Sequence, residues 1–147
     1  MSGWESDLLT GLAQYLEDQG VAAYRPTGTY LSTETAVVFG DLPTSPDRAI
    51  GLTLYGASDD PTQNLSTVRV QVMMRGNANA ALDIGDLATA AFNALQGLTN
   101  RDFGTAHVID TRRVSAVPLG IDHNKRYMRA DNYEIPLNTP YSAGRTI

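Results

Sequence analysis

Two histidines and the carboxylates near them are the residues best suited to acid–base chemistry. His107 lies in a segment of β-forming residues, and His123 follows Asp122 in a polar, turn-like stretch. Side chains of consecutive residues diverge, so the adjacency of Asp122 and His123 does not imply an orienting hydrogen bond. A Ser-His-Asp arrangement assembled from distant residues stays open, because triads are defined by geometry. Both histidines otherwise fit structural positions in a strand and a turn.

Acidic residues occur in two groups, of which Asp59-Asp60 could bind a metal ion or act as a general acid. Asp59 and Asp60 lie in a polar segment typical of a hairpin loop, where aspartate is a common turn residue. Asp83 and Asp86 fall where a helix begins, and carboxylates there complement the helix dipole. The chain has no cysteine, and it contains none of the common phosphate-loop, dinucleotide, nucleophile-elbow or zinc motifs. We therefore expect no catalytic residue, metal or cofactor.

Basic residues near the C-terminus could contact nucleic acid. Arg112-Arg113 and Lys125-Arg126 could meet phosphates while Tyr127 stacks on a base. Aspartates interrupt this group, and the chain's net charge of −5 argues against nucleic acid as a partner. A small hydrolase or a nucleic-acid-binding domain remains an alternative function.

The charge is distributed unevenly along the chain. Residues 1–100 carry 4 basic and 11 acidic side chains, a net charge of −7, whereas residues 101–147 carry 7 basic and 5 acidic, a net charge of +2. Exposed arginines often serve only solubility. The alternative is a contact between unlike faces of neighbouring subunits, since complementary charge fixes register and partner choice.

The length and composition predict one folded domain. The 147 residues are 42% hydrophobic and 18% charged, which is ordinary for a globular protein. We expect residues 1–137 to form this domain and residues 138–147 to form an extended tail. No signal-peptide pattern or apolar run of about 20 residues is present, which predicts a soluble protein made in the cytoplasm.

Apolar spacing predicts two helices. Leucines and Tyr15 recur at helical spacing over residues 8–16, with Ser2 or Ser6 as a possible cap and Gly20 as a terminator. A second helix is expected from a cap at Asn77 or Asn79 to about Gln96, with an alanine-rich stripe that allows close packing on a sheet.

Leu65–Gly76 contains the clearest strand. Its apolar residues, Val68, Val70, Val72 and Met74, alternate with Arg69, Gln71, Met73 and Arg75. One face is therefore core, and the other is mainly polar and a candidate subunit interface. The segment 49–57 alternates as well, and the short polar connection between the two predicts an antiparallel hairpin.

The other strands are less regular. Short strands are expected at Val21–Arg25 and Ala36–Phe39. Longer ones are expected at Thr105–Val117 and Arg126–Leu137, and these two are joined through turns at Pro118–Gly120 and Asp122–Lys125. The predicted fold is α+β: two helices on one face of a mostly antiparallel sheet of four to six strands, in the order α-β-β-β-α-β-β.

The order of these segments resembles the tail terminator (minor capsid) family of long-tailed bacteriophages. The resemblance rests on Pro46–Tyr55, on Ser66–Gly76, on the helix Ala78–Gln96 and on Arg126-Tyr127 with Asn132-Tyr133. It extends over about residues 5–137, and its motifs are short and structural. The polar character of Tyr127–Tyr133 departs from the family pattern.

The resemblance implies a structural protein of the virion. Such proteins form a ring, generally of six subunits, that caps the completed tail tube and meets the head-side connector or stopper protein. The implied partners are copies of the chain itself, the tail tube protein and the connector, with no membrane and no specific nucleic acid. The implied location is the tail or neck of the virion after assembly in the host cytoplasm. Another neck or tail-tube ring component is the alternative.

A ring needs two different patches on each subunit. We expect one side of this joint, or the contact with tube or connector, to include arginines of the basic C-terminal part and the polar face of the strand 65–76. These candidates are Arg69, Gln71, Met73, Arg75, Arg112, Arg113, Arg126 and Arg129. The apolar-poor tail around Tyr141 is expected to order only on assembly.

Overall fold

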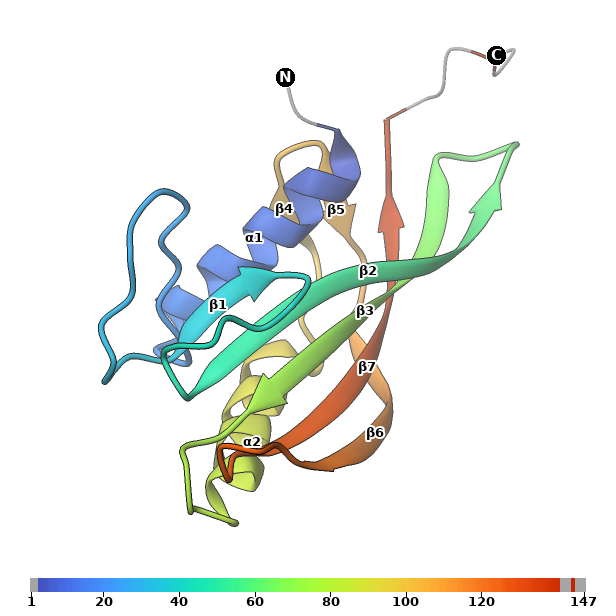
Figure 1. Ribbon diagram of the computed structural model, residues 1–147. Coiled ribbons are helices and arrows are strands. Elements are labelled where there is room, and N and C mark those ends of the chain that lie inside the picture. Colours follow the sequence, from blue (N-terminus) through green and yellow to red (C-terminus); the bar gives the residue numbers. More distant parts are fainter. Residues whose placement is uncertain (1–2, 141–143, 145–147) are drawn as a thin grey trace.

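The computed structural model describes residues 3–140 and residue 144, and it shows two helices on one side of a strongly twisted sheet (Figure 1). The elements in chain order are α1 (Trp4–Asp18), β1 (Ala36–Phe39), β2 (Ala49–Asp60), β3 (Leu65–Arg75), α2 (Asp83–Leu95), β4 (Arg101–Phe103), β5 (Ala106–Val108), β6 (Arg112–Ile121) and β7 (Tyr127–Asn138). The predicted α+β class and element order are confirmed. The short strands β4 and β5 bring the sheet to seven strands.

The sheet is antiparallel except at one edge. Its strands follow the order β1-β2-β3-β7-β5-β4, and β6 pairs with β7 beside β5. Among the strands of the described residues, β1 and β2 alone pair in parallel. Outside these strands, Ala23 makes a parallel bridge to Ala36. The predicted hairpin of β2 and β3 is confirmed, with Leu52 opposite Val72. A bulge between Tyr55 and Ala57, where Gly56 has φ +62°, interrupts this ladder before the hairpin tip.

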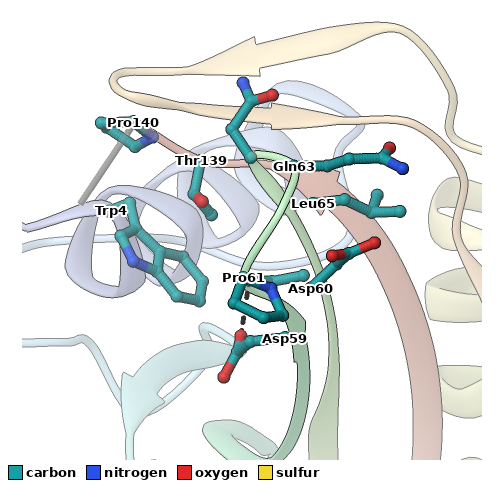
Figure 2. Close-up of a pocket in the computed structure, with 10 residues that line it drawn as sticks. Trp4, Asp59, Asp60, Pro61, Gln63, Leu65, Thr139 and Pro140 are labelled. Atoms are coloured by element: carbon teal, nitrogen blue, oxygen red, sulfur yellow. Dashed lines mark hydrogen bonds between the residues drawn. The ribbon is translucent and has the colours of Figure 1, made fainter. Parts of the chain in front are cut away.

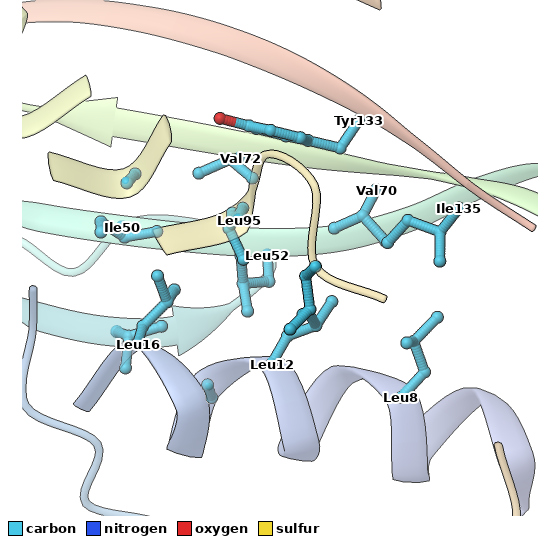
Figure 3. Packing of buried hydrophobic residues seen from close by; sticks show 14 of the residues in the cluster. Leu8, Leu12, Leu16, Ile50, Leu52, Val70, Val72, Leu95, Tyr133 and Ile135 are labelled. Carbon is cyan, nitrogen blue, oxygen red and sulfur yellow. The ribbon is translucent and has the colours of Figure 1, made fainter. Parts of the chain in front are cut away.

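The core lies between the helices and one face of the sheet. Leucines of α1, spaced one turn apart, point at the sheet, where they meet Leu52 of β2 and Val70 and Val72 of β3 (Figure 3). The predicted apolar face of β3 is confirmed, since Val68, Val70, Val72 and Met74 are at most 1% exposed. This burial fixes the strand register, because a slip of one residue would turn these side chains outward.

Both helices begin at residues other than the predicted caps. The N-cap of α1 is Gly3, without a side-chain hydrogen bond. The N-cap of α2 is Leu82, because the residues from Asn77 onwards form a turn. Asn79 has φ +60° there, and its N–H donates to the carbonyl of Lys125. Neither helix of the described residues is long and apolar enough to cross a bilayer.

Three predictions for the less regular strands were wrong in detail. Val21–Arg25 makes only one isolated bridge, from Ala23 to Ala36. The segment expected to be one strand, Thr105–Val117, is divided between β5 and β6. Pro118–Gly120 is no turn but part of β6, where the register shifts between Pro118 and Gly120. Proline is tolerated there because β6 pairs with only one neighbour. The predictions made for Tyr141 and most of the tail fall outside the described residues.

Candidate interface surfaces

The face of the sheet opposite the helices carries half of the predicted interface residues. Arg69, Gln71 and Met73 lie on this helix-free face, because they alternate with the buried residues of β3. Arg69 pairs with Glu134 of β7 at 3.7 Å, and Arg112 of β6 donates to the same carboxylate at 2.6 Å. The structure therefore brings residues of three strands together around one glutamate.

Glu134 has its ionised form stabilised by these arginines. The hydrogen bond from Arg112 lowers the pKa of Glu134. Burial acts in the opposite direction, and the charges of Arg112 and Arg69 add to the lowering. The same hydrogen bond raises the pKa of Arg112. Glu134 was not among the residues predicted from the sequence, although its position in the β-forming segment 126–137 could have marked it as a partner for arginines of neighbouring strands.

A second row of hydrogen bonds crosses the helix-free face. The hydroxyl of Tyr55 on β2 donates to Oδ1 of Asn132 on β7 at 2.7 Å, and Nδ2 of Asn132 donates to Oγ of Ser115 on β6 at 2.9 Å. Asn132 lies opposite Gln71 in the β3–β7 register. These bonds hold side chains of three strands in place, so the helix-free face presents an ordered polar surface.

Arg113 and Arg129 lie on the other side of the sheet, near α2. Both pair with Asp131, whose side chain is fully buried; Arg113 Nη1 is 3.4 Å and Arg129 Nε 2.8 Å from its carboxylate oxygens. The guanidinium of Arg113 also stacks over the ring of Phe92, 4.4 Å from its centre. The positive charges of Arg113 and Arg129 are thus partly balanced by the buried carboxylate of Asp131.

Arg75 and Arg126, both candidate interface residues, are buried, although Arg75 was expected on the polar face of its strand. Arg75 is 5% exposed and donates to the backbone carbonyls of Asp47, Pro43 and Pro46 at 2.6–2.9 Å. Its burial, and next the nearby charge of Arg126, lower its pKa from the usual value for arginine. The loop before β2 covers this end of β3, and this cover explains why a residue on the polar side of the pattern is buried.

Arg126 ties the same loop to the β6–β7 turn. Arg126 is 4% exposed, and its guanidinium contacts Asp122, Asp47 and the carbonyl of Thr44 at 2.7–3.1 Å. Burial works against ionisation of Asp122, but hydrogen bonds from the backbone and side chain of Arg126 outweigh it and lower the pKa of Asp122. The side chains of Arg75 and Arg126 thus serve the chain's own loop.

A groove lies between the start of α1 and the tip of the β2–β3 hairpin. It has a volume of about 540 Å³, and Figure 2 shows the indole of Trp4 beside Pro61 and Asp59. Thr139, after β7, closes it by donating its N–H to the carbonyl of Asn64 at 2.9 Å. The groove is open, and its lining combines carboxylates and amides with apolar residues such as Trp4, Pro61 and Leu65; neither histidine lines it.

His107 does form a close pair with a carboxylate. Its Nδ1 lies 2.6 Å from Oδ1 of Asp102 across the β4–β5 hairpin, and the Asp102 side chain is 79% exposed. Within residues 3–140, no hydroxyl or amine is hydrogen-bonded to the His107 ring as a triad nucleophile would be. That part of the chain also holds no group of three histidine or carboxylate residues placed to bind a metal.

One exposed feature was not predicted from the sequence. Strand β6 is exposed along nearly its whole length, and it presents four large apolar residues that are 39–50% exposed: Val114, Val117, Leu119 and Ile121. The available signal was the run of eight uncharged residues over 114–121. It was divided by the turn predicted at Pro118.

Comparison with known structures supports this fold. One chain in the virion of a native gene transfer agent particle superposes with a TM-score of 0.54 at 11% sequence identity. The match covers 69% of this chain and 78% of the other. At this identity the likeness establishes the fold alone.

Comparison of the sequences identifies the family. No curated protein matches the sequence. The family model of the bacteriophage tail terminator protein matches residues 15–139, which extend from α1 through β7 and include the hairpin and β6. The chain therefore belongs to the bacteriophage tail terminator family.

Proposed function

We propose that this protein forms a closed ring that ends the tail tube of a long-tailed phage and joins it to the head-side connector or stopper protein. The observation that carries the proposal is the family match over residues 15–139. In this role the protein acts without catalysis, metal or cofactor. It is assembled in the host cytoplasm and remains in the neck of the virion.

The helix-free face supports this role. Arg69, Gln71, Met73 and Arg112 lie on or beside an ordered polar surface that no helix covers. Arg69 and Arg112 keep 49% and 62% of their side chains exposed, and they share one glutamate, so this surface retains positive charge. We assign it to contact with the tube or the connector, where polar, wet contacts suit an assembly step between separately made parts.

The experiment combines purified protein with purified tail tubes. Native mass spectrometry should show a closed oligomer, and electron microscopy should show a ring at one end of each tube. A protein that stays monomeric both alone and with tubes refutes the ring. Open, stacking tubes built from this protein would instead show a tail-tube component. Filter binding that weakens with salt would favour the nucleic-acid alternative.

A further inference from the structure

We infer that the subunits of the ring meet head to tail, with the exposed edge strand β6 of one copy docked against the β1 side of the next. This inference rests on the proposed ring. It identifies the second copy of the chain as the occupant of an edge that the described part of the subunit leaves open.

The β6 edge has the composition of a buried surface. Its residues 114–121 carry no charge, and Val117, Leu119 and Ile121 are 45–50% exposed. Exposed edge strands are normally protected by charged side chains, because a bare edge invites pairing with another chain. An uncharged apolar edge of this length on a soluble domain indicates a surface that becomes covered.

The contact uses side chains more than backbone pairing. Pro118 has no N–H to donate, and register shifts between Arg113 and Ser115 and between Pro118 and Gly120 interrupt the ladder. A continuous sheet across the joint is therefore disfavoured. The same features protect the free subunit from uncontrolled edge-to-edge stacking.

The second patch lies at the opposite edge of the sheet. Strand β1 ends the order β1-β2-β3-β7, at the far side from β6. Phe39 at its end is 42% exposed, and Leu31 in the preceding loop is 66% exposed. This loop is held against β1 by the hydroxyl of Tyr30, which donates to the carbonyl of Val37 at 2.8 Å. Two different apolar patches at opposite edges suit a heterologous joint, which can close into a ring.

Charge favours this pairing over a symmetric one. Residues 112–134, which include β6, carry five basic and three acidic side chains, a net charge of +2. Residues 17–42, which include β1, carry one basic and four acidic, a net charge of −3. The net charges of these two segments are opposite, so long-range attraction favours a contact between the unlike segments of two copies over a contact between two β6 segments.

The test uses charge substitutions on each edge. Val117→Glu and Ile121→Glu alter the β6 edge, and Leu31→Glu and Phe39→Glu alter the β1 side. Asn93→Glu, on an exposed position of α2, is the matched control. Under conditions where the wild type forms rings, native mass spectrometry should show only monomers for each edge variant and rings for the control.

Mixing the two kinds of variant gives the decisive result. A β6-edge variant keeps an intact β1 side, and a β1-side variant keeps an intact β6 edge. Each mixture should therefore form a dimer of twice the monomer mass and nothing larger. Dimers in the mixture also show that both variants are folded.

Three outcomes would overturn the inference while leaving the ring standing. These are rings from the β6-edge variants, dissociation of the Asn93→Glu control, and mixtures that stay monomeric. Cross-linking gives an independent readout, because the chain has no cysteine of its own. A variant with the single substitution Val117→Cys should cross-link to a variant with the single substitution Phe39→Cys, and neither variant should cross-link to itself. A wild type that never assembles, with or without tubes, would refute the proposed function and the inference together.

Discussion

Replacing Arg75 by alanine tests whether the buried arginine holds the loop before β2 in place. Arg75 donates three hydrogen bonds to the carbonyls of Asp47, Pro43 and Pro46. A hydrogen bond from a charged group contributes about 1.5–3 kcal/mol, and breaking a buried charged contact typically costs about 3–5 kcal/mol. Water can reach part of the vacated loop, so we expect Arg75→Ala to lower the free energy of unfolding by about 3–4 kcal/mol.

Arg69→Ala is the matched control, because Arg69 lies on the same strand and its contact with Glu134, at 3.7 Å, is exposed. That substitution should cost about 0–1 kcal/mol. Arg75→Lys should fall between the two, since one ammonium group does not reproduce the planar fork that reaches three carbonyls. Urea unfolding of each variant gives the free energies, with unchanged slopes confirming a common unfolding reaction. A loss for Arg75→Ala within about 1 kcal/mol of that for Arg69→Ala would refute the reasoning.

Three further predictions concern the core and the helix-free face. Gly11→Ala should lower the thermal stability, because a Cβ at position 11 would overlap the ring of Phe103. This overlap should outweigh the gain in helix propensity, about 1 kcal/mol. An increase in Tm would contradict this prediction. Tyr133→Phe should keep or raise the free energy of unfolding, since the buried Tyr133 hydroxyl has no hydrogen-bond partner among the described residues and burial raises its pKa. A loss above about 1 kcal/mol would contradict this and point to an ordered water on that hydroxyl. The pKa of Glu134 is lowered on folding, so its contribution is present above the unfolded pKa and is lost as pH falls through the folded one. Glu134→Gln should therefore flatten the pH dependence of stability below about pH 5, and curves of equal steepness would refute the role of this carboxylate.

Local sequence patterns correctly predicted those elements whose structure depends mainly on residues close in sequence. The alternation in β3 gave its buried face, because one side of that strand packs on the helices along most of its length. The short polar loop between β2 and β3 gave their antiparallel pairing. In both cases periodicity and turn chemistry agree with the tertiary structure.

Contacts distant in sequence account for the errors. Arg75 follows the polar side of the alternation, but the loop that buries it lies about 30 residues earlier and its path is set by tertiary packing. Asn79 was expected to cap α2, but its N–H is bonded to the β6–β7 turn at Lys125. Proline was taken as a turn signal at Pro118, whereas an edge strand accommodates it without losing a hydrogen bond.

The interface residues predicted from the sequence differ from the surface that the structure favours, and the reason is related. Sequence charge asymmetry drew attention to the C-terminal arginines, but most of them are paired with carboxylates of their own chain; Asp131 and Glu134 each take two. An arginine bound in this way contributes net charge to a region while its hydrogen-bonding groups are already occupied. Charge can then steer encounter and select the partner edge, but affinity must come from surface that the subunit itself leaves uncovered. On the described part of this chain the β6 edge is such a surface, because it combines exposed apolar side chains with the absence of charge over residues 114–121.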